Sequence, residues 1–326
     1  MDQDKDGPGR PFGIGGSDVA AALGLSPYRT PMQLWHELLS RDVAGPVRGA
    51  AALHLRFGQH AEPFLAEEYE RCTGLRTRAH AETLRHPRHG FMFGHVDRLV
   101  YASGAKNTDR ALGAGAESEQ PTAVLECKTA SAFSRQGWGT AGTDQVPTQY
   151  LLQCVWYMAL TGCPSAELAV LIGNNDFRIY SVARDLQLEA AVIERVERFW
   201  NDHVIAKTPP KALRPEDASI AWPQEQAGAS VQASEEIAGA VELYRHHNAL
   251  ASEAEGECER LKAQIMSFMG SAERLTVGGH AVATWRSASP ALRLDARLLS
   301  REHPQLAAAY SKRSPGARRF LLKEPR

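Results

Sequence analysis

Two apolar stretches, residues 91–101 and 122–128, carry the clearest β pattern in the chain. Both are rich in β-branched or aromatic residues and are bounded by segments rich in glycine and serine, so we predict two strands. The residues between them, 102–120, have little to bury and are expected to form a long hairpin loop. Side chains alternate along a strand, so Glu126 and Lys128 should point to the same face.

Residues 146–162 are predicted to form a buried helix, because a proline lies at its start, a glycine ends it and nearly every position is apolar. The polar exceptions, Gln149, Gln153 and Tyr157, recur every four residues and therefore form one stripe. That stripe is either a narrow solvent-exposed face or one wall of a polar active site.

Two further strands are predicted at 166–172 and 177–182, with turn residues between them, and an amphipathic helix at 186–203. This order of strands and helices predicts an α/β fold with a mixed central β-sheet flanked by helices.

A helix around residues 57–69 contains Pro63, so we expect it to restart near Ala61 or to kink there. Glu62 would then lie at or near a helix start. It is either a partner of the helix dipole or a further carboxylate facing the active site.

Glycines precede Ser17 at the start of an alanine-rich stretch, so Ser17 is predicted to cap a helix. A helix start behind small residues can also bind an anion, and a DNA phosphate could sit at Ser17 with Arg10 nearby. A second helix should start at Thr30, where Pro31 and Gln33 complete a capping box.

Changes in composition divide the chain into a disordered start (1–9), an α/β domain (10–207), a linker (208–234) and a mainly helical C-terminal extension (235–326). The extension is predicted to hold a charged helix or helical pair, a hairpin around Gly278 and Gly279, two short helices and a basic tail after Tyr310. The tail is either solvated or an arm that contacts the DNA backbone.

Bulk composition excludes several classes of protein. The net charge is −1, so any nucleic-acid surface must be a local patch. The 5 cysteines form no CxxC pair, which argues against a disulfide framework or a zinc ribbon and favours a reducing cytoplasm. We expect no membrane span and no signal peptide. Four histidines lie before or near the Asp97 strand: His80, His86, His89 and His95. We expect their side chains to be solvated or to contact phosphate rather than to bind zinc.

Pairing of the first two strands would place Asp97 beside Glu126. Two carboxylates offer the hard oxygen ligands that Mg²⁺ or Mn²⁺ prefer, and Lys128 would be close enough to orient water or contact a phosphate. On these residues alone, a surface ion pair across an exposed strand is the simpler alternative.

The whole set of motifs resembles the YqaJ-like viral recombinase family of PD-(D/E)xK nucleases, which is related to phage lambda exonuclease. The matching motifs occur in the family's order between residues 10 and 203 and are Gly13-Ile14-Gly15-Gly16-Ser17-Asp18, Ser26-Pro27-Tyr28, Phe57-Gly58-Gln59-His60-Ala61-Glu62-Pro63, Gly94-His95-Val96-Asp97, Leu125-Glu126-Cys127-Lys128 and Gln153-x-x-x-Tyr157. Such a co-linear set is more specific than any one motif.

The resemblance implies a restriction-endonuclease-like core in which Asp97, Glu126 and Glu62 bind the metal together with the backbone carbonyl of Cys127. It implies that Lys128 assists the attacking water. The metal would be Mg²⁺, with Mn²⁺ as the alternative.

Other roles also follow from the resemblance. Gln153 and Tyr157 would support the site or contact DNA, and Arg10 and Ser17 would hold a 5′ phosphate. Arg98 departs from the family pattern, because glycine commonly follows the metal-binding aspartate.

The implied activity is a 5′-to-3′ exonuclease on linear double-stranded DNA ends, working in a bacterial host cytoplasm. It would supply 3′ single strands to a single-strand annealing protein, and the exonuclease would be a homo-oligomer. A structure-selective or restriction-like endonuclease and a non-catalytic DNA-end-binding scaffold are the alternatives.

Overall fold

The computed structural model describes residues 12–40, 50–102, 120–133, 137–292, 294–312, 316 and 318–323. The chain divides into two compact units, Met1–Pro223 and Gln224–Arg326. Residues 1–9, predicted to be disordered, and most of the predicted loop between 102 and 120 lie outside the described residues. The boundary between the units falls inside the predicted linker.

A five-stranded mixed sheet forms the centre of the first unit, with the strand order β1-β4-β5-β6-β7. β5 and β6 are parallel and the other neighbours are antiparallel. Parallel neighbours need a crossover, and helix α4 (Thr148–Thr161) supplies it between β5 and β6. The strands are β1 (Arg76–Ala79), β4 (Arg98–Tyr101), β5 (Ala123–Ala130), β6 (Ser165–Ile172) and β7 (Asp176–Ala183). The predicted mixed sheet is confirmed.

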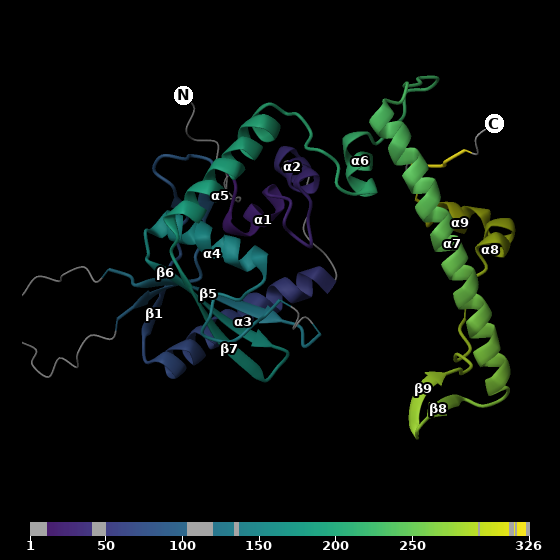
Figure 1. Cartoon of the computed structure of the whole chain (residues 1–326), viewed down its shortest axis with the longest axis horizontal. Coiled ribbons are helices and arrows are strands. Elements are labelled where there is room, and N and C mark those ends of the chain that lie inside the picture. Colours follow the sequence, from purple (N-terminus) through teal and green to yellow (C-terminus); the bar gives the residue numbers. More distant parts are fainter. Residues whose placement is uncertain are drawn as a thin grey trace, which may run out of the picture. The chain divides into compact units, whose positions relative to one another are not determined.

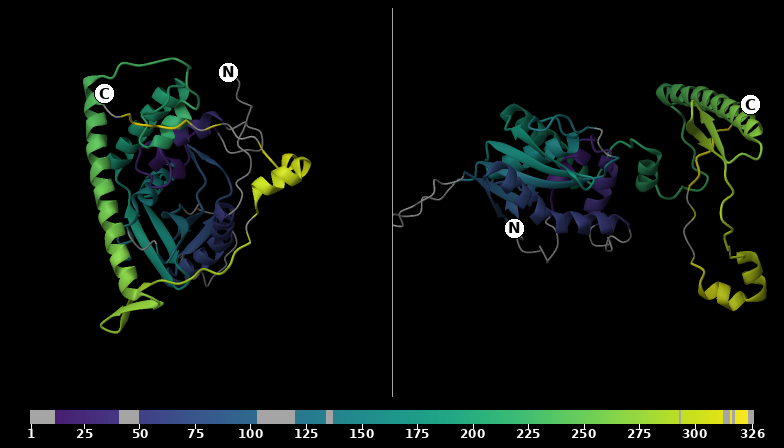
Figure 2. Two further views of the ribbon diagram at one scale, coloured as in Figure 1. Left: turned by 90° about the vertical axis from the view of Figure 1, so that its right-hand side faces the viewer. Right: turned by 90° about the horizontal axis from the view of Figure 1, so that it is seen from below.

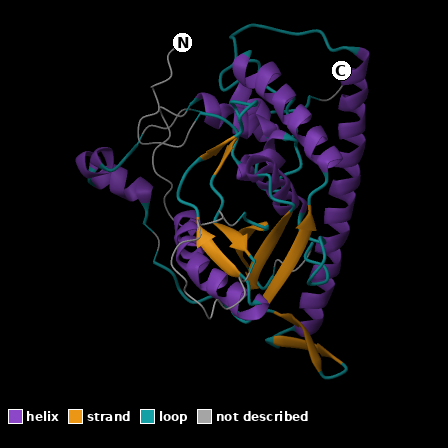
Figure 3. Cartoon of the chain, turned by 90° about the vertical axis from the view of Figure 1, so that its left-hand side faces the viewer, coloured by secondary structure: helices purple, strands orange, loops and turns teal. Residues whose placement is uncertain are grey.

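Helices cover both faces of this sheet, as Figures 1 and 3 show. Helix α3 (Ala50–Thr73) packs Ala66 and Tyr69 against Leu125 of β5. On the other face, Val124 packs into a larger core that contains the buried side of α4 and of α5 (Leu186–Phe199). The predicted buried helix is confirmed: eight consecutive residues of α4 are buried, and it ends at Gly162 in the left-handed conformation, with φ of 77°.

Helix α3 corrects the expected restart near Ala61, because it runs without a break through Pro63, whereas the alternative of a kink stays a prediction. Glu62 therefore lies in the middle of a helix and not near its start. Proline inside a helix costs about 3 kcal/mol. Burial of Leu65 and Tyr69, at about 1.5–3 kcal/mol for each large apolar side chain, offsets that cost.

The predicted strand over 91–101 is in fact two strands, β3 (Phe93–Gly94) and β4. β3 pairs with β2 (Leu84–Arg85) in a separate two-stranded sheet. The break between them contains Asp97, whose carboxylate accepts the backbone N–H of Cys127 on β5. A side chain thus takes the place of a backbone pairing at this point.

The N-terminal helices differ from the prediction at Ser17. A 3₁₀ turn, η1 (Gly16–Asp18), leads into the four-residue α1 (Val19–Ala22), and Ser17 is exposed inside the turn. Gly15 is the N-cap of η1, and Asp18, the third residue of the turn, accepts the N–H of Gly15 at 3.0 Å through its Oδ2. Its longer carboxylate reaches back across the turn. The capping box of α2 (Pro31–Leu39) is confirmed, with Thr30 as its cap.

The predicted linker, 208–234, contains a short helix, α6 (Pro215–Ala221). It packs against α2, where Thr30 Oγ1 donates to Asp217 Oδ1 at 2.6 Å. Asp217 is fully buried, and its other oxygen accepts the N–H of Leu213. This buried carboxylate ties 213–221 to the first unit. Before it, α5 continues into a π-helical segment, η2 (Trp200–Ile205).

The second unit is built around one long helix, α7 (Glu235–Met269), rather than a helical pair. The predicted hairpin is confirmed: β8 (Arg274–Val277) and β9 (His280–Thr284) turn at Gly278 and Gly279, which have φ of 57° and 82°. Figure 2 shows the hairpin beside the C-terminal end of α7. Two short helices follow, α8 (Ala296–Glu302) and α9 (Pro304–Ala309).

Part of the basic tail lies against α7. Phe320 packs edge-on to Tyr244 with ring centres 5.9 Å apart, and Arg245 donates to the carbonyl of Lys323 at 2.8 Å. Among the described residues, no helix is long and apolar enough to cross a lipid bilayer.

Candidate active site

The structure brings Asp97 to the middle of β5. Asp97 lies at a bend immediately before β4, and the β4–β5 register pairs Arg98 with Leu125. Asp97 Oδ2 accepts the backbone N–H of Cys127 at 2.8 Å. The carboxylate is therefore fixed next to the strand that carries Glu126.

Glu126 is the centre of the site. It is 2% exposed, so the alternative of a surface ion pair does not describe it. Its Oε1 accepts hydrogen bonds from Lys128 Nζ and, at 2.6 Å, from Gln153 Nε2. Its Oε2 is buried and accepts no hydrogen bond from the described residues. A buried carboxylate oxygen in this condition needs a cation or another donor.

Two of the three side chains in the polar stripe of α4 point into the protein. Gln153 and Tyr157 are buried, and Gln153 Nε2 also donates to the Tyr157 hydroxyl at 3.1 Å. Both side chains therefore support Glu126 rather than lie on the surface.

Two glycines leave room for the Tyr157 ring. A Cβ on Gly16 would lie 2.5 Å from Tyr157 Cε1, and one on Gly94 would lie 2.9 Å from the same atom. The glycine-rich motif at the N-terminus thus has a packing role beside the site.

Glu62 completes the acidic group from the opposite helix, α3. Burial, followed by the charge of Asp97, raises the pKa of Glu62, and the charges of Arg98 and Lys128 oppose this. Arg98 is a site residue that we did not predict. The sequence contains one signal for it, because Arg98 directly follows Asp97. However, side chains alternate along a strand, and this alternation would place Arg98 and Asp97 on opposite faces of the sheet.

Burial dominates the electrostatics of the group. It raises the pKa of Glu126 to about 7, with Lys128 opposing and Asp97 adding to the rise. Burial also raises the pKa of Asp97. For Lys128, burial lowers the pKa, but the charges of Glu126 and Asp97 outweigh it and raise the pKa above its ordinary value. Lys128 is therefore an ammonium at neutral pH and acts as a donor and positive charge.

The donor set fits a hard divalent cation. Within the described ranges, no three His, Cys, Asp or Glu side chains are already arranged as a closed metal site. Mg²⁺ does not require one, because it is commonly held by one or two carboxylates, with water and substrate phosphates as its other ligands. Glu126 Oε2, which has no partner among the residues that the structure describes, meets that smaller requirement together with the carboxylate of Asp97.

The remaining candidates from the sequence are Arg10, Ser17 and the loop histidines. Arg10 lies outside the described residues, and Ser17 is exposed on η1. His95 contacts Thr83, and His89 contacts Glu197 at 3.3 Å. A phosphate site at Ser17 and a carbonyl ligand at Cys127 stay predictions.

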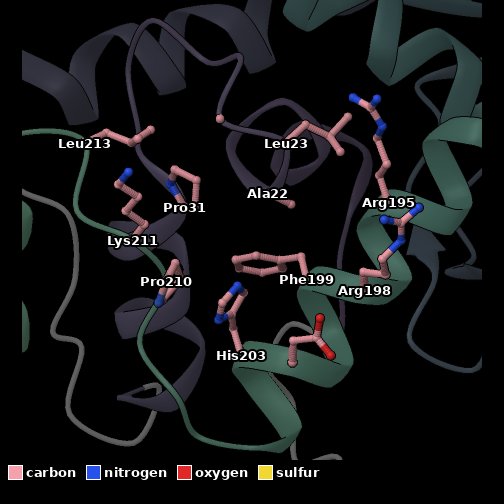
Figure 4. Close-up of a pocket in the computed structure, with 12 residues that line it drawn as sticks. Ala22, Leu23, Pro31, Arg195, Arg198, Phe199, His203, Pro210, Lys211 and Leu213 are labelled. Carbon is pink, nitrogen blue, oxygen red and sulfur yellow. The ribbon is translucent and has the colours of Figure 1, made fainter. Parts of the chain in front are cut away.

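A second polar region of the first unit is an open cavity of about 520 Å³ between α1, the end of α5 and the segment 210–213. Figure 4 shows Arg195 and Arg198 on one wall, Lys211 on the opposite wall and the Phe199 ring between them. We name it the basic cavity. No predicted site residue lines it.

Comparison with known proteins supports the resemblance. Residues 8–164 match the family model of the YqaJ-like viral recombinase domain. The uncharacterized protein YqaJ of Bacillus subtilis (strain 168) is 28% identical over 318 residues, which cover 96% of this chain and 91% of that protein. The predicted family resemblance is confirmed.

Two solved structures are similar at low identity. An alkaline exonuclease from Laribacter hongkongensis has a TM-score of 0.44 and 17% identity, covering 60% of this chain and 90% of that one. A phage-related exonuclease from Haemophilus somnus 129PT has a TM-score of 0.41 and 14% identity, covering 60% of this chain and 96% of that one.

Proposed function

We propose that this chain, which contains a YqaJ-like viral recombinase domain, is a Mg²⁺-dependent deoxyribonuclease that degrades linear double-stranded DNA from its ends. The observation that carries the proposal is the buried Glu126, whose Oε2 accepts no hydrogen bond from the described part of the chain while Asp97 and Lys128 adjoin it. Burying a carboxylate in this way costs stability unless a cation offsets it. Such an arrangement is expected at a metal-dependent active site and serves no evident structural purpose.

Glu126 and Asp97 would hold the cation, with Glu62 of α3 as the third carboxylate. When bound, Mg²⁺ supplies Lewis acidity toward the phosphodiester and the attacking water, and Mn²⁺ could replace it. The carboxylates are already aligned by bonds within the protein: Cys127 N–H to Asp97 and Gln153 Nε2 to Glu126.

Lys128 would contact the substrate as a fixed positive charge. In the metal-free protein, the charges of Glu126 and Asp97 raise its pKa and favour the ammonium form. In the reaction, water adds to phosphorus and loses a proton to the solvent, while the P–O bond to the leaving oxygen breaks. Lys128 can donate to the attacking water or to a phosphate oxygen and so stabilise the charge that develops.

The finer features of the proposal follow the family resemblance. They are digestion from the 5′ end, a 3′ single strand for an annealing protein, a homo-oligomeric enzyme and a 5′-phosphate contact at Ser17 with Arg10. The exposed side chain of Ser17 is compatible with that contact.

The test uses linear duplex DNA labelled separately at its 5′ and 3′ ends, with closed circular DNA beside it. We expect Mg²⁺-dependent loss from the 5′ ends, with no loss in EDTA or with Asp97→Asn, an isosteric variant that keeps the bend. Cleavage of the closed circle would instead indicate an endonuclease. DNA-end binding without any metal-dependent cleavage would make the protein a scaffold.

A further inference from the structure

A small pocket opens where β5 ends, beside the carboxylate group. Its volume is about 300 Å³, at the lower end of the size range of small-ligand pockets, which is roughly 300–1,000 Å³. Aromatic rings and short polar side chains line it together: Tyr28, Tyr150, Trp138, Thr129, Ser131 and Gln149. The pocket therefore offers flat apolar surfaces with hydrogen-bonding groups at their edge.

The aromatic rings of this pocket differ in their exposure and in how tightly they are packed. Trp138 is 8% exposed and stacks on Tyr150, with ring centres 5.4 Å apart and planes 25° from parallel. These two rings form a fixed wall. Tyr28 is 74% exposed, so most of its ring is available to a ligand. An aromatic side chain exposed to that extent contributes little to packing within the chain.

Tyr150 connects the pocket to the carboxylate group. Lys128 Nζ lies 5.4 Å from the centre of the Tyr150 ring. Burial raises the pKa of Tyr150, and the charge of Lys128 opposes this. A ligand in the pocket would therefore lie next to any phosphate that Lys128 contacts.

We propose that this pocket is a nucleobase subsite, in which the base of the terminal nucleotide stacks on Tyr28 while its phosphodiester lies at Lys128. This inference rests on the proposed nuclease function. Stacking on an aromatic ring accepts all four bases, because each has a π face. The side chains of Ser131 and Gln149 can each donate or accept a hydrogen bond, so they do not select one base. The subsite therefore positions the DNA end, and the enzyme accepts any of the four bases there.

The experiment removes the base and the ring in turn. Two linear duplexes are compared that differ only at the 5′-terminal nucleotide, which is either normal or an abasic tetrahydrofuran residue with the same phosphates. We expect the wild-type protein to release the normal nucleotide about 10-fold faster at subsaturating DNA, a typical size for one stacked base. Tyr28→Ala should abolish this difference, and Tyr28→Phe should keep it.

Leu25→Ala is the matched control, because Leu25 is 52% exposed on the same loop and does not line the pocket. It should leave the preference for the normal end unchanged. Equal rates on the two duplexes with the wild-type protein, or a preserved difference in Tyr28→Ala, would overturn the subsite.

A binding measurement separates failure of the subsite from failure of the nuclease proposal. DNA that carries 2-aminopurine at its 5′ end is mixed with the protein in EDTA, where stacking on a ring should quench its fluorescence. Quenching by the wild type and by Tyr28→Phe, but not by Tyr28→Ala, would support the subsite even if no duplex were cleaved. The absence of quenching in all three would refute it.

Discussion

Two charged regions of the first unit, the carboxylate group and the basic cavity, differ in how far their charged side chains are exposed to water. In the carboxylate group, Glu126 is 2% exposed and its bonds come from Lys128 and Gln153. In the basic cavity, Arg195 and Lys211 are exposed at an open rim. Water screens the charges of the cavity. Glu126 is buried, so the loss of any one of its hydrogen-bond partners leaves its charge poorly compensated and has a larger energetic cost. Single substitutions should therefore have large effects in the first region and small effects in the second.

The largest effect in this comparison is expected at Gln153, whose side chain donates to the buried Glu126. Gln153→Ala removes one of the two hydrogen bonds to Glu126 Oε1 and leaves Lys128 as the only remaining donor of the pair. Loss of such an orienting partner typically costs about 10–100-fold in metal affinity or activity. We expect that loss in DNA cleavage, with a raised Mg²⁺ requirement.

Tyr157→Phe tests the same network one step further out. It removes the hydroxyl that accepts from Gln153 and leaves the bond between Gln153 and Glu126 in place. It should reduce cleavage less than Gln153→Ala does. Unchanged Mg²⁺ dependence in Gln153→Ala would show that Glu126 does not depend on its partner.

Packing around Tyr157 should give the next largest effect. In Gly16→Ala, the new Cβ would lie 2.5 Å from the Tyr157 ring, so the ring or the turn must shift. Overpacking of this kind costs about 1–3 kcal/mol in the free energy of unfolding. Urea denaturation measures it, and cleavage should fall as well because Tyr157 contacts Gln153.

Gly58→Ala is the matched control for added volume. Gly58 lies within α3, and a Cβ there would meet nothing within 4 Å. Alanine is favoured over glycine inside a helix by about 1 kcal/mol, so this variant should be slightly more stable than the wild type. Destabilisation by both variants to the same extent would exclude a specific contact at Tyr157.

The pH dependence of the metal-free protein gives a further, smaller test. The pKa of Glu126 is raised from 4.5 to about 7 in the folded state, so the folded protein binds more protons than the unfolded chain between these values. Stability in EDTA should fall as the pH rises through this window and level off above it. The raised pKa values of Asp97 and Glu62 act in the same direction.

Glu126→Gln removes the buried charge and should flatten this decline in part, because Asp97 and Glu62 remain. Thermal melting in EDTA from about pH 5 to pH 8 measures both proteins across the window in which the linkage acts. A wild-type melting temperature that stays constant over this range would contradict the electrostatic account of the site.

The local pattern was sufficient to predict the parts of the site that depend on alternation and periodicity. The strand over 123–130 and the buried helix over 148–161 were recognisable because each has one clear period. The same periods predicted that Glu126 and Lys128 share a face and that Gln153 and Tyr157 share a stripe. These four residues are indeed in contact.

The parts that were missed depend on tertiary contacts. Pro63 suggested a helix start, but packing of α3 on the sheet keeps the helix continuous. Asp18, rather than Ser17, makes the side-chain hydrogen bond at the start of η1, because its carboxylate reaches Gly15. Likewise, α6 lies in a segment of linker-like composition and is held by the buried Asp217. None of these contacts leaves a periodic signal in the sequence.

The smallest effect is expected in the basic cavity. The double variant Arg195→Ala and Lys211→Ala removes two exposed charges that face a region lined partly by Phe199. Exposed substitutions usually change stability by no more than about 0.5 kcal/mol. We expect the melting temperature and the maximal cleavage rate to stay close to those of the wild type. A loss of cleavage rate as large as that of Gln153→Ala would show that the cavity belongs to the catalytic machinery, and the contrast between a buried and a screened region would then be wrong.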